Sequence, residues 1–335
     1  MDAMILVDAL RNPADTATLD ADTWIALITI ARAEQLLGTL SRRLSGVEVP
    51  PEVRSILDEA RVNAEYHRRS ALWEADCARR AMGDEVGKIV LMKGTAYVAA
   101  GLKAGEGRHI GDLDIMVARG ALDAAETALL GAGWEWVKTD PYDDAYYRNH
   151  MHELPPMIHS ARDRMIDVHH TILPLSAGPR PDAQAMLTDA VALENGVYVF
   201  SNADIVIHSA AHLFADGELD GGLRNLWDIH CLLSEFADDS FWPELRARAV
   251  HHQLWPAVHR VARLAHHLYG TEIPEAWQAR KWCDRYFIAR MTARDEWGRG
   301  TRKILRRSFY MRGHWLRMPP IMLARHLWIK WRRGN

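Results

Sequence analysis

Two aspartates stand one residue apart in the stretch GDLDIMV, where Asp112 and Asp114 follow Gly111 and precede an apolar run. In a β-strand, side chains two residues apart point to the same side of the sheet. We therefore expect the two carboxylates side by side, where they repel each other unless a cation or a proton lies between them. Carboxylate oxygens are ligands that Mg²⁺ and Mn²⁺ prefer. The spacing predicts a metal site.

A third acid, Asp167, lies between two branched apolar residues in the stretch RMIDVHHTI. An acid without partners would be costly in such an apolar strand, and two-metal phosphoryl chemistry usually needs a further carboxylate to complete the site. We therefore expect Asp167 to join the two earlier aspartates. His169 would share the strand face of Asp167, either packed at the sheet edge or supporting the site.

A candidate phosphate-binding segment precedes the aspartate pair. Gly94 and Thr95 follow the apolar run KIVLM and come before a predicted short helix. Backbone N–H groups at such a position can face phosphate oxygens, and a glycine lets the ligand approach closely. Lys93 and Arg108 would supply positive charge. A phosphate-binding segment close to a metal site predicts a nucleotide site.

Two residue pairs in the later helical part have one-turn spacing. His208 and His212 are expected on a helix that lines the nucleotide site. Arg224 and Asp228 are also four residues apart, which permits an ion pair within the helix.

Several histidines fall close together in the stretch that precedes and follows Asp167. Seventeen histidines in one chain will cluster by chance, and no cysteine accompanies these four. The sequence therefore does not favour a zinc site built from His150, His152, His159 and His170.

The pattern along the chain is helical, then mixed, then helical. Apolar residues recur with helical period over residues 21–82, with Pro51 in a first turn. Residues 83–200 show a β-α-β-α-β-β order, in which YYRNHMHELPPMIH and RMIDVHHTI are read as strands around a turn. From Ser201, a candidate N-cap, the helical period returns. We therefore expect three regions: 1–82, 83–200 and 201–335.

The composition is that of a globular protein. Of the 335 residues, 48% are hydrophobic and 25% charged, and no apolar run is long enough to span a bilayer. The first twenty residues do not resemble a secretory signal. Three widely spaced cysteines, outside any CxxC pattern, argue against a disulfide framework and suit a reducing cytoplasm.

Basic residues are concentrated at the end of the chain. Residues 299–335 hold eleven of the 41 Lys and Arg and no acidic residue, which leaves 30 basic against 44 acidic residues elsewhere. Such a tail could contact RNA, an anionic membrane surface or an acidic protein. It could equally pack against the acidic remainder of its own chain.

The motifs LMKGTAYVAAGL, RHIGDLDIMV and IDVHH resemble those of the uncharacterised nucleotidyltransferases, within the DNA-polymerase-β-type superfamily. The resemblance implies an α+β fold with a mixed β-sheet core, helices against it and helical regions on either side. Asp112 and Asp114 would bind two Mg²⁺ or Mn²⁺ ions, and Asp167 would complete the site of the catalytic ion. It also implies nucleotide contacts from Lys93, Gly94, Thr95, Arg108, Gly111 and Arg224, with His169, His212 and Asp228 around them.

The implied reaction is transfer of a nucleoside monophosphate from an NTP, with ATP the expected nucleotide, to an acceptor hydroxyl. Pyrophosphate would be released, and the acceptor would be a small molecule, a peptide or a protein. A tRNA- or RNA-directed, or toxin-like, nucleotidyltransferase is one alternative, favoured by the basic tail. A non-catalytic nucleotide-binding scaffold is the other, and the full set of three acids argues against it.

Overall fold

The computed structural model describes residues 2–137, 140–215, 219 and 221–317. The chain begins with helices, which over residues 21–82 agree with the apolar period, and the first three span 7 to 13 residues. The longest helix, α4, starts with Pro51 at its first position and spans 32 residues, about 48 Å. The N-terminal helices are α1 (Met4–Arg11), α2 (Ala21–Ala33), α3 (Leu37–Arg43) and α4 (Pro51–Met82).

A seven-stranded mixed sheet follows, with the strand order β3-β4-β5-β2-β1-β7-β6. Strand β2 pairs with β5 in parallel and with β1 antiparallel, so β2 lies inside the sheet. All four of its residues are buried. The strands are β1 (Val90–Leu91), β2 (Leu113–Met116), β3 (Trp134–Trp136), β4 (Met157–His159), β5 (Met165–His169), β6 (Val191–Ala192) and β7 (Tyr198–Val199).

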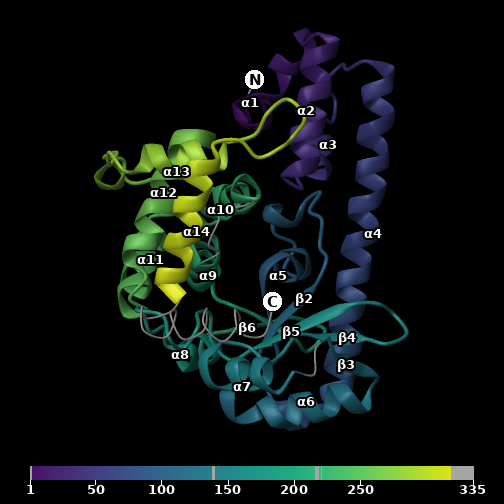
Figure 1. The fold of residues 1–335 in the computed structure, drawn as a ribbon, viewed down its shortest axis with the longest axis vertical. Coiled ribbons are helices and arrows are strands. Elements are labelled where there is room, and N and C mark those ends of the chain that lie inside the picture. Colours follow the sequence, from purple (N-terminus) through teal and green to yellow (C-terminus); the bar gives the residue numbers. More distant parts are fainter. Residues whose placement is uncertain (1, 138–139, 216–218, 220, 318–335) are drawn as a thin grey trace.

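Helices α5 (Lys93–Ala99) and α6 (Leu122–Gly131) connect the first strands. Helix α4 contacts both of them as well as β2, so it runs beside the sheet (Figure 1). The α+β prediction, with a mixed sheet and helices around it, is confirmed.

The prediction of a strand over YYRNHMHELPPMIH is wrong for its first half. Residues Pro141–His150 form helix α7, and only Met157–His159 form a strand. The reason lies just upstream, because the Asp140 carboxylate accepts hydrogen bonds from the N–H groups of Tyr142 and Asp143. A capping aspartate, a proline at the first position and acids in the first turn outweigh the strand preference of the tyrosines. Strands β3 and β6 and the short helix α8 (Ala183–Thr188) were not predicted.

The remaining helices form a layer on the other side of the molecule from α4 (Figure 1). Ser201 caps the first of them as predicted, since its Oγ accepts the Asp204 N–H at 3.3 Å. These helices are α9 (Asn202–Ala215), α10 (Gly222–Phe236), α11 (Phe241–His251), α12 (Trp255–Tyr269), α13 (Asp284–Met291) and α14 (Lys303–Arg317).

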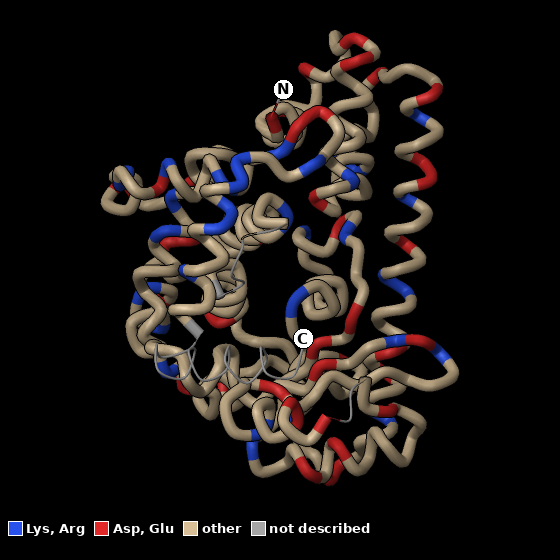
Figure 2. Tube along the Cα trace, viewed as in Figure 1, with Lys and Arg blue, Asp and Glu red and all other residues tan. Residues whose placement is uncertain are grey.

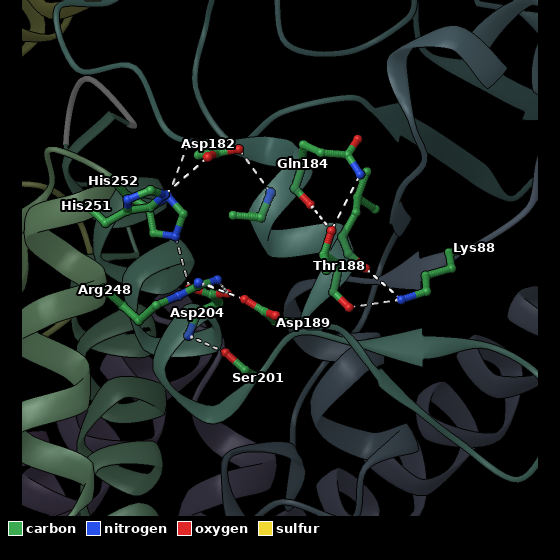
Figure 3. A network of polar contacts seen from close by, with 12 residues as sticks. Lys88, Asp182, Gln184, Thr188, Asp189, Ser201, Asp204, Arg248, His251 and His252 are labelled. Atoms are coloured by element: carbon green, nitrogen blue, oxygen red, sulfur yellow. Dashed lines mark hydrogen bonds and ion pairs between the residues drawn. The ribbon is translucent and has the colours of Figure 1, made fainter.

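A polar network ties α8, α9 and α11 together (Figure 3). The buried Asp204 carboxylate accepts from Arg248 Nε at 3.1 Å and lies 3.2 Å from His252 Nε2. Arg248 also bonds Asp189 at 2.7 Å, and on α8 the Asp182 carboxylate accepts the Ala185 N–H as an N-cap. The network therefore fixes α8 and α9 to α11.

Part of the basic tail is helix α14, which packs on the protein through one side. Phe309 is buried, with its ring 5.1 Å from that of Phe287. Ile304 and Trp315 remain largely exposed. Lys and Arg recur along α14, whereas acidic residues are spread over the N-terminal helices and the sheet region (Figure 2). Residues 318–335 of the predicted tail lie outside the described residues.

Two further predictions can be compared with the structure. Cys77, Cys231 and Cys283 are free thiols. None of the described helices is long and apolar enough to cross a membrane.

Candidate active site

Strands β2 and β5 bring the three predicted carboxylates together. Asp114 and Asp167 are register partners in the parallel pair, and Asp112 directly precedes β2. One carboxylate oxygen from each of the three lies within 4.8 Å of the others. Asp114 is buried, Asp167 is partly buried and Asp112 is exposed. The expected proximity of the three acids is therefore confirmed.

Asp114 is held by two donors from different elements. Lys93 Nζ lies 2.6 Å from Asp114 Oδ1, and His169 Nε2 lies 3.0 Å from the same oxygen. Burial would raise the pKa of Asp114, but Lys93 and His169 hold it far below its ordinary value. Burial also opposes the charge on Lys93, and the Asp114 carboxylate outweighs it, so the Lys93 pKa is raised. The pair is charged at neutral pH.

The other two acids are crowded by negative charge. Burial, followed by the charges of Asp114 and Glu153, raises the pKa of Asp167 to about 7. Partial withdrawal from water, followed by the charge of Asp114, raises the pKa of Asp112. One ammonium does not balance three carboxylates, and a divalent cation would relieve their repulsion. An all-oxygen donor set of this kind fits Mg²⁺ or Mn²⁺.

The first turn of α5 is unusual in its backbone. Lys93 has φ of 49°, a left-handed conformation that non-glycine residues rarely adopt. Gly94 follows, and a Cβ there would lie 2.5 Å from Arg108 Nε. Glycine is therefore required by the close approach of Arg108, a reason that the sequence did not reveal. Thr95 is buried, and the space around Gly111 is open.

Two arginines share one carboxylate next to this segment. Arg108 and Arg224 both pair with Asp228, and Arg224 also donates to Thr39 Oγ1 at 2.7 Å. The ion pair that the spacing permits within α10 is thus present, and Arg108 pairs with the same carboxylate. Two guanidinium groups on one carboxylate leave an excess of positive charge beside Gly94.

Helix α9 faces the Lys93 region, as expected for a helix near the site. Tyr97 OH and Ser209 Oγ are hydrogen-bonded at 2.7 Å, which ties α5 to α9. Burial, then the charge of Lys93, lowers the pKa of His208 to about 3 and that of His212 well below its ordinary value. Both imidazoles are therefore neutral at physiological pH.

A profile of the family described as uncharacterised nucleotidyltransferase matches residues 20–270. The chain belongs to this family. The matched range runs from α2 through α12 and contains every predicted site residue, from Lys93 to Asp228. The general role of the protein is accordingly that of a nucleotidyltransferase, a transferase that uses an NTP as substrate. A comparison with curated proteins finds no match.

One polar residue next to this nucleotidyltransferase site was not predicted. Glu153 forms an isolated bridge with His169, and its Oε2 lies 3.4 Å from His169 Nδ1. The sequence did not favour a zinc site built from His150, His152, His159 and His170, and among the described residues these four do not gather as a set. His152 joins a cluster of possible metal ligands with Glu153 and His169. The only signal in the sequence was an acid among histidines, which is too common to be informative.

Proposed function

We propose that the protein is a metal-dependent nucleotidyltransferase that moves a nucleoside monophosphate from an NTP to an acceptor hydroxyl and releases pyrophosphate. The observation that carries the proposal is the convergence of Asp112, Asp114 and Asp167, with oxygens within 4.8 Å of one another. A surface pair of acids would not need a third one on a neighbouring buried strand.

Each acid has a proposed role. Asp112 and Asp114 would hold two divalent ions, and Asp167 would share one of them. When bound, the ions would offset negative charge on the attacking and leaving oxygens. Asp167 would also accept the proton of the acceptor hydroxyl.

The phosphates would lie beside Lys93 and Gly94. Backbone N–H groups at the first turn of α5 would face phosphate oxygens, next to Arg108, which fills the space that a side chain at Gly94 would take. Because the Thr95 side chain is buried, its contact would be through the backbone. Arg108 and Arg224 would add the excess positive charge of their shared pair with Asp228, and Gly111 would leave room next to Asp112. His212 would lie beside Lys93.

The proposed transfer is an in-line displacement at the α-phosphorus. The acceptor oxygen forms a bond to the α-phosphorus, and the bond to the oxygen bridging the α- and β-phosphates breaks. Pyrophosphate leaves with that electron pair, and the hydroxyl proton passes to Asp167. We propose ATP as the nucleotide and a small molecule, peptide or protein as the acceptor.

Other features bear on the setting of the reaction. RNA as acceptor was favoured by the basic tail, but the described part of the tail, α14, packs through Phe309 and lies outside the matched family range. Three free thiols fit a reducing compartment, and we propose the cytoplasm.

The test supplies each α-phosphate-labelled NTP with Mg²⁺ and separate pools of small molecules, proteins and RNA. We expect label in one pool together with released pyrophosphate, and a loss of at least about a thousandfold in Asp114→Asn. Asp123→Asn, an exposed acid on α6, is the matched control and should keep full activity. Equal activity in Asp114→Asn, or no pyrophosphate release with any pool, would contradict the proposal.

A further inference from the structure

A second group of possible ligands lies behind the carboxylate site. One ring nitrogen each of His152 and His169 and one Glu153 oxygen lie within 4.8 Å of one another. Glu153 Oε2 is 3.4 Å from His169 Nδ1 and 3.6 Å from His152 Nε2. The His169 side chain is 3% exposed, while those of His152 and Glu153 are 21% and 17% exposed. Solvent therefore reaches the group from one side.

The two ring nitrogens of His169 face two different carboxylates. Nε2 lies 3.0 Å from Asp114 Oδ1, and Nδ1 lies 3.4 Å from Glu153 Oε2. Within the described residues, this Nδ1 of His169 is buried without a hydrogen-bond partner. His152 faces the same Glu153 oxygen through its Nε2. A buried ring nitrogen and a carboxylate oxygen that face each other without a hydrogen bond need a cation or a proton between them.

The distances match those of a small transition-metal site. Zinc binds imidazole nitrogen and carboxylate oxygen at about 2.0–2.2 Å, which places ligands of a tetrahedral site about 3.4 Å apart. The observed separations of 3.4 and 3.6 Å fall close to that value. A metal-binding histidine also commonly donates its other ring N–H to a carboxylate, as His169 does to Asp114.

We propose that His152, Glu153 and His169 bind a divalent transition-metal ion of the Zn²⁺ class, separate from the Mg²⁺ or Mn²⁺ site. Two imidazoles and one carboxylate favour Zn²⁺ over Mg²⁺. The ion would also hold the His169 ring in the orientation in which it donates to Asp114. The proposal goes beyond nucleotidyl transfer, because Zn²⁺ binding needs neither NTP nor acceptor.

The test measures Zn²⁺ binding by calorimetry after treatment with chelator, in the full chain carrying Asp112→Asn and Asp167→Asn. These changes weaken the carboxylate site and leave Asp114 as the partner of His169. We expect one equivalent of Zn²⁺ to bind. Adding His152→Gln or Glu153→Gln should weaken binding by at least about tenfold.

The matched control adds His251→Gln, which removes a half-exposed histidine paired with Asp182 on the distant α11. It should leave Zn²⁺ affinity unchanged. Circular dichroism checks the fold of each variant. His152 and Glu153 are both partly exposed, so if one substitution prevents folding, the other still tests the proposal. Absence of Zn²⁺ binding in the parent variant would overturn the proposal. So would unchanged affinity in either folded ligand variant.

Discussion

Asp114 is the residue on which the candidate site depends most. It lies in the middle of the sheet, accepts from Lys93 and His169 on one oxygen, and is the register partner of Asp167. The two donors keep it ionised in spite of its burial. In the free protein, Lys93 thus already neutralises part of the charge that a metal ion would offset.

Gly94 packs tightly against the Arg108 side chain. In Gly94→Ala the new Cβ would lie 2.5 Å from Arg108 Nε, and the Arg108 guanidinium cannot move freely because it is paired with Asp228. We expect the free energy of unfolding to fall by about 1–3 kcal/mol, as for other overpacked sites. Urea unfolding measures the change.

The control is Gly120→Ala, where a Cβ would meet no atom within 4 Å and φ is not positive. Its free energy of unfolding should change by less than about 0.5 kcal/mol. Equal free energies of unfolding for the two variants would show that the position of Arg108 does not require a glycine at residue 94.

The three aspartates could be predicted from sequence because their signals are local. Asp112 and Asp114 have strand spacing before an apolar run, and Asp167 lies within another. The reason for Gly94 could not be predicted, since it depends on an arginine fourteen residues later folding back onto it. Glu153 was missed for a similar reason, because only strand pairing brings it to His169.

At the scale of elements, the helices around the sheet are joined by buried ion pairs. Asp204 is fully buried at the start of α9 and pairs with Arg248 on α11 (Figure 3). Burial alone would raise the pKa of Asp204, but the hydrogen bonds from His252 and Arg248 hold it below its ordinary value. The charged form is therefore favoured by folding.

Asp204→Asn should lower the free energy of unfolding by about 2–3 kcal/mol at neutral pH. Because the folded pKa is depressed, the contribution of Asp204 is complete above its unfolded pKa of about 3.9 and is lost as pH falls through the folded value. The difference in the free energy of unfolding between wild type and Asp204→Asn should therefore become smaller below about pH 4. Urea unfolding at a series of pH values measures it.

Asp189→Asn serves as the comparison, since Asp189 bonds the same Arg248 but its side chain is 50% exposed. It should cost less than about 1 kcal/mol. A gap for Asp204→Asn that stays constant from pH 7 to about pH 3 would contradict the linkage argument.

The order of elements was predictable where the periodic pattern was long. The helices of residues 21–82, β2, β5 and α10 have clear apolar periods, and each occurs where expected. Helix α7 was not predicted, because the N-cap at Asp140 favours a helix in a segment whose tyrosines favour a strand. Strands β3 and β6 are three and two residues long, too short to show a period.

At the scale of the whole molecule, the N-terminal helices meet the segment that follows α13 (Figure 1). Ala3 N–H donates to the Thr292 carbonyl at 3.2 Å, and Arg294 Nε lies 2.7 Å from the buried Glu34 carboxylate. A Cβ at Gly298 would lie 2.9 Å from Thr29 O. Segments more than 250 residues apart therefore support each other.

Arg294→Leu tests the contact between the N-terminal helices and the segment after α13, because it leaves the buried Glu34 carboxylate without its guanidinium partner. We expect a loss of about 3 kcal/mol in the free energy of unfolding. Arg42→Leu, which removes a pair with Glu106 whose side chains are both more than half exposed, should cost less than about 1 kcal/mol. Equal losses in the two variants would contradict a supporting role for the Glu34 pair.

We propose that the three aspartates form a metal-dependent nucleotide site. This proposal is tested most directly by calorimetric titration of the chelator-treated protein with each NTP, with and without Mg²⁺ or Mn²⁺, beside Asp112→Asn/Asp114→Asn. We expect binding of ATP, or of another single preferred NTP, that requires the metal ion and is lost in the folded double variant. Failure of the folded wild-type protein to bind any NTP, or equal binding by the double variant, would contradict it.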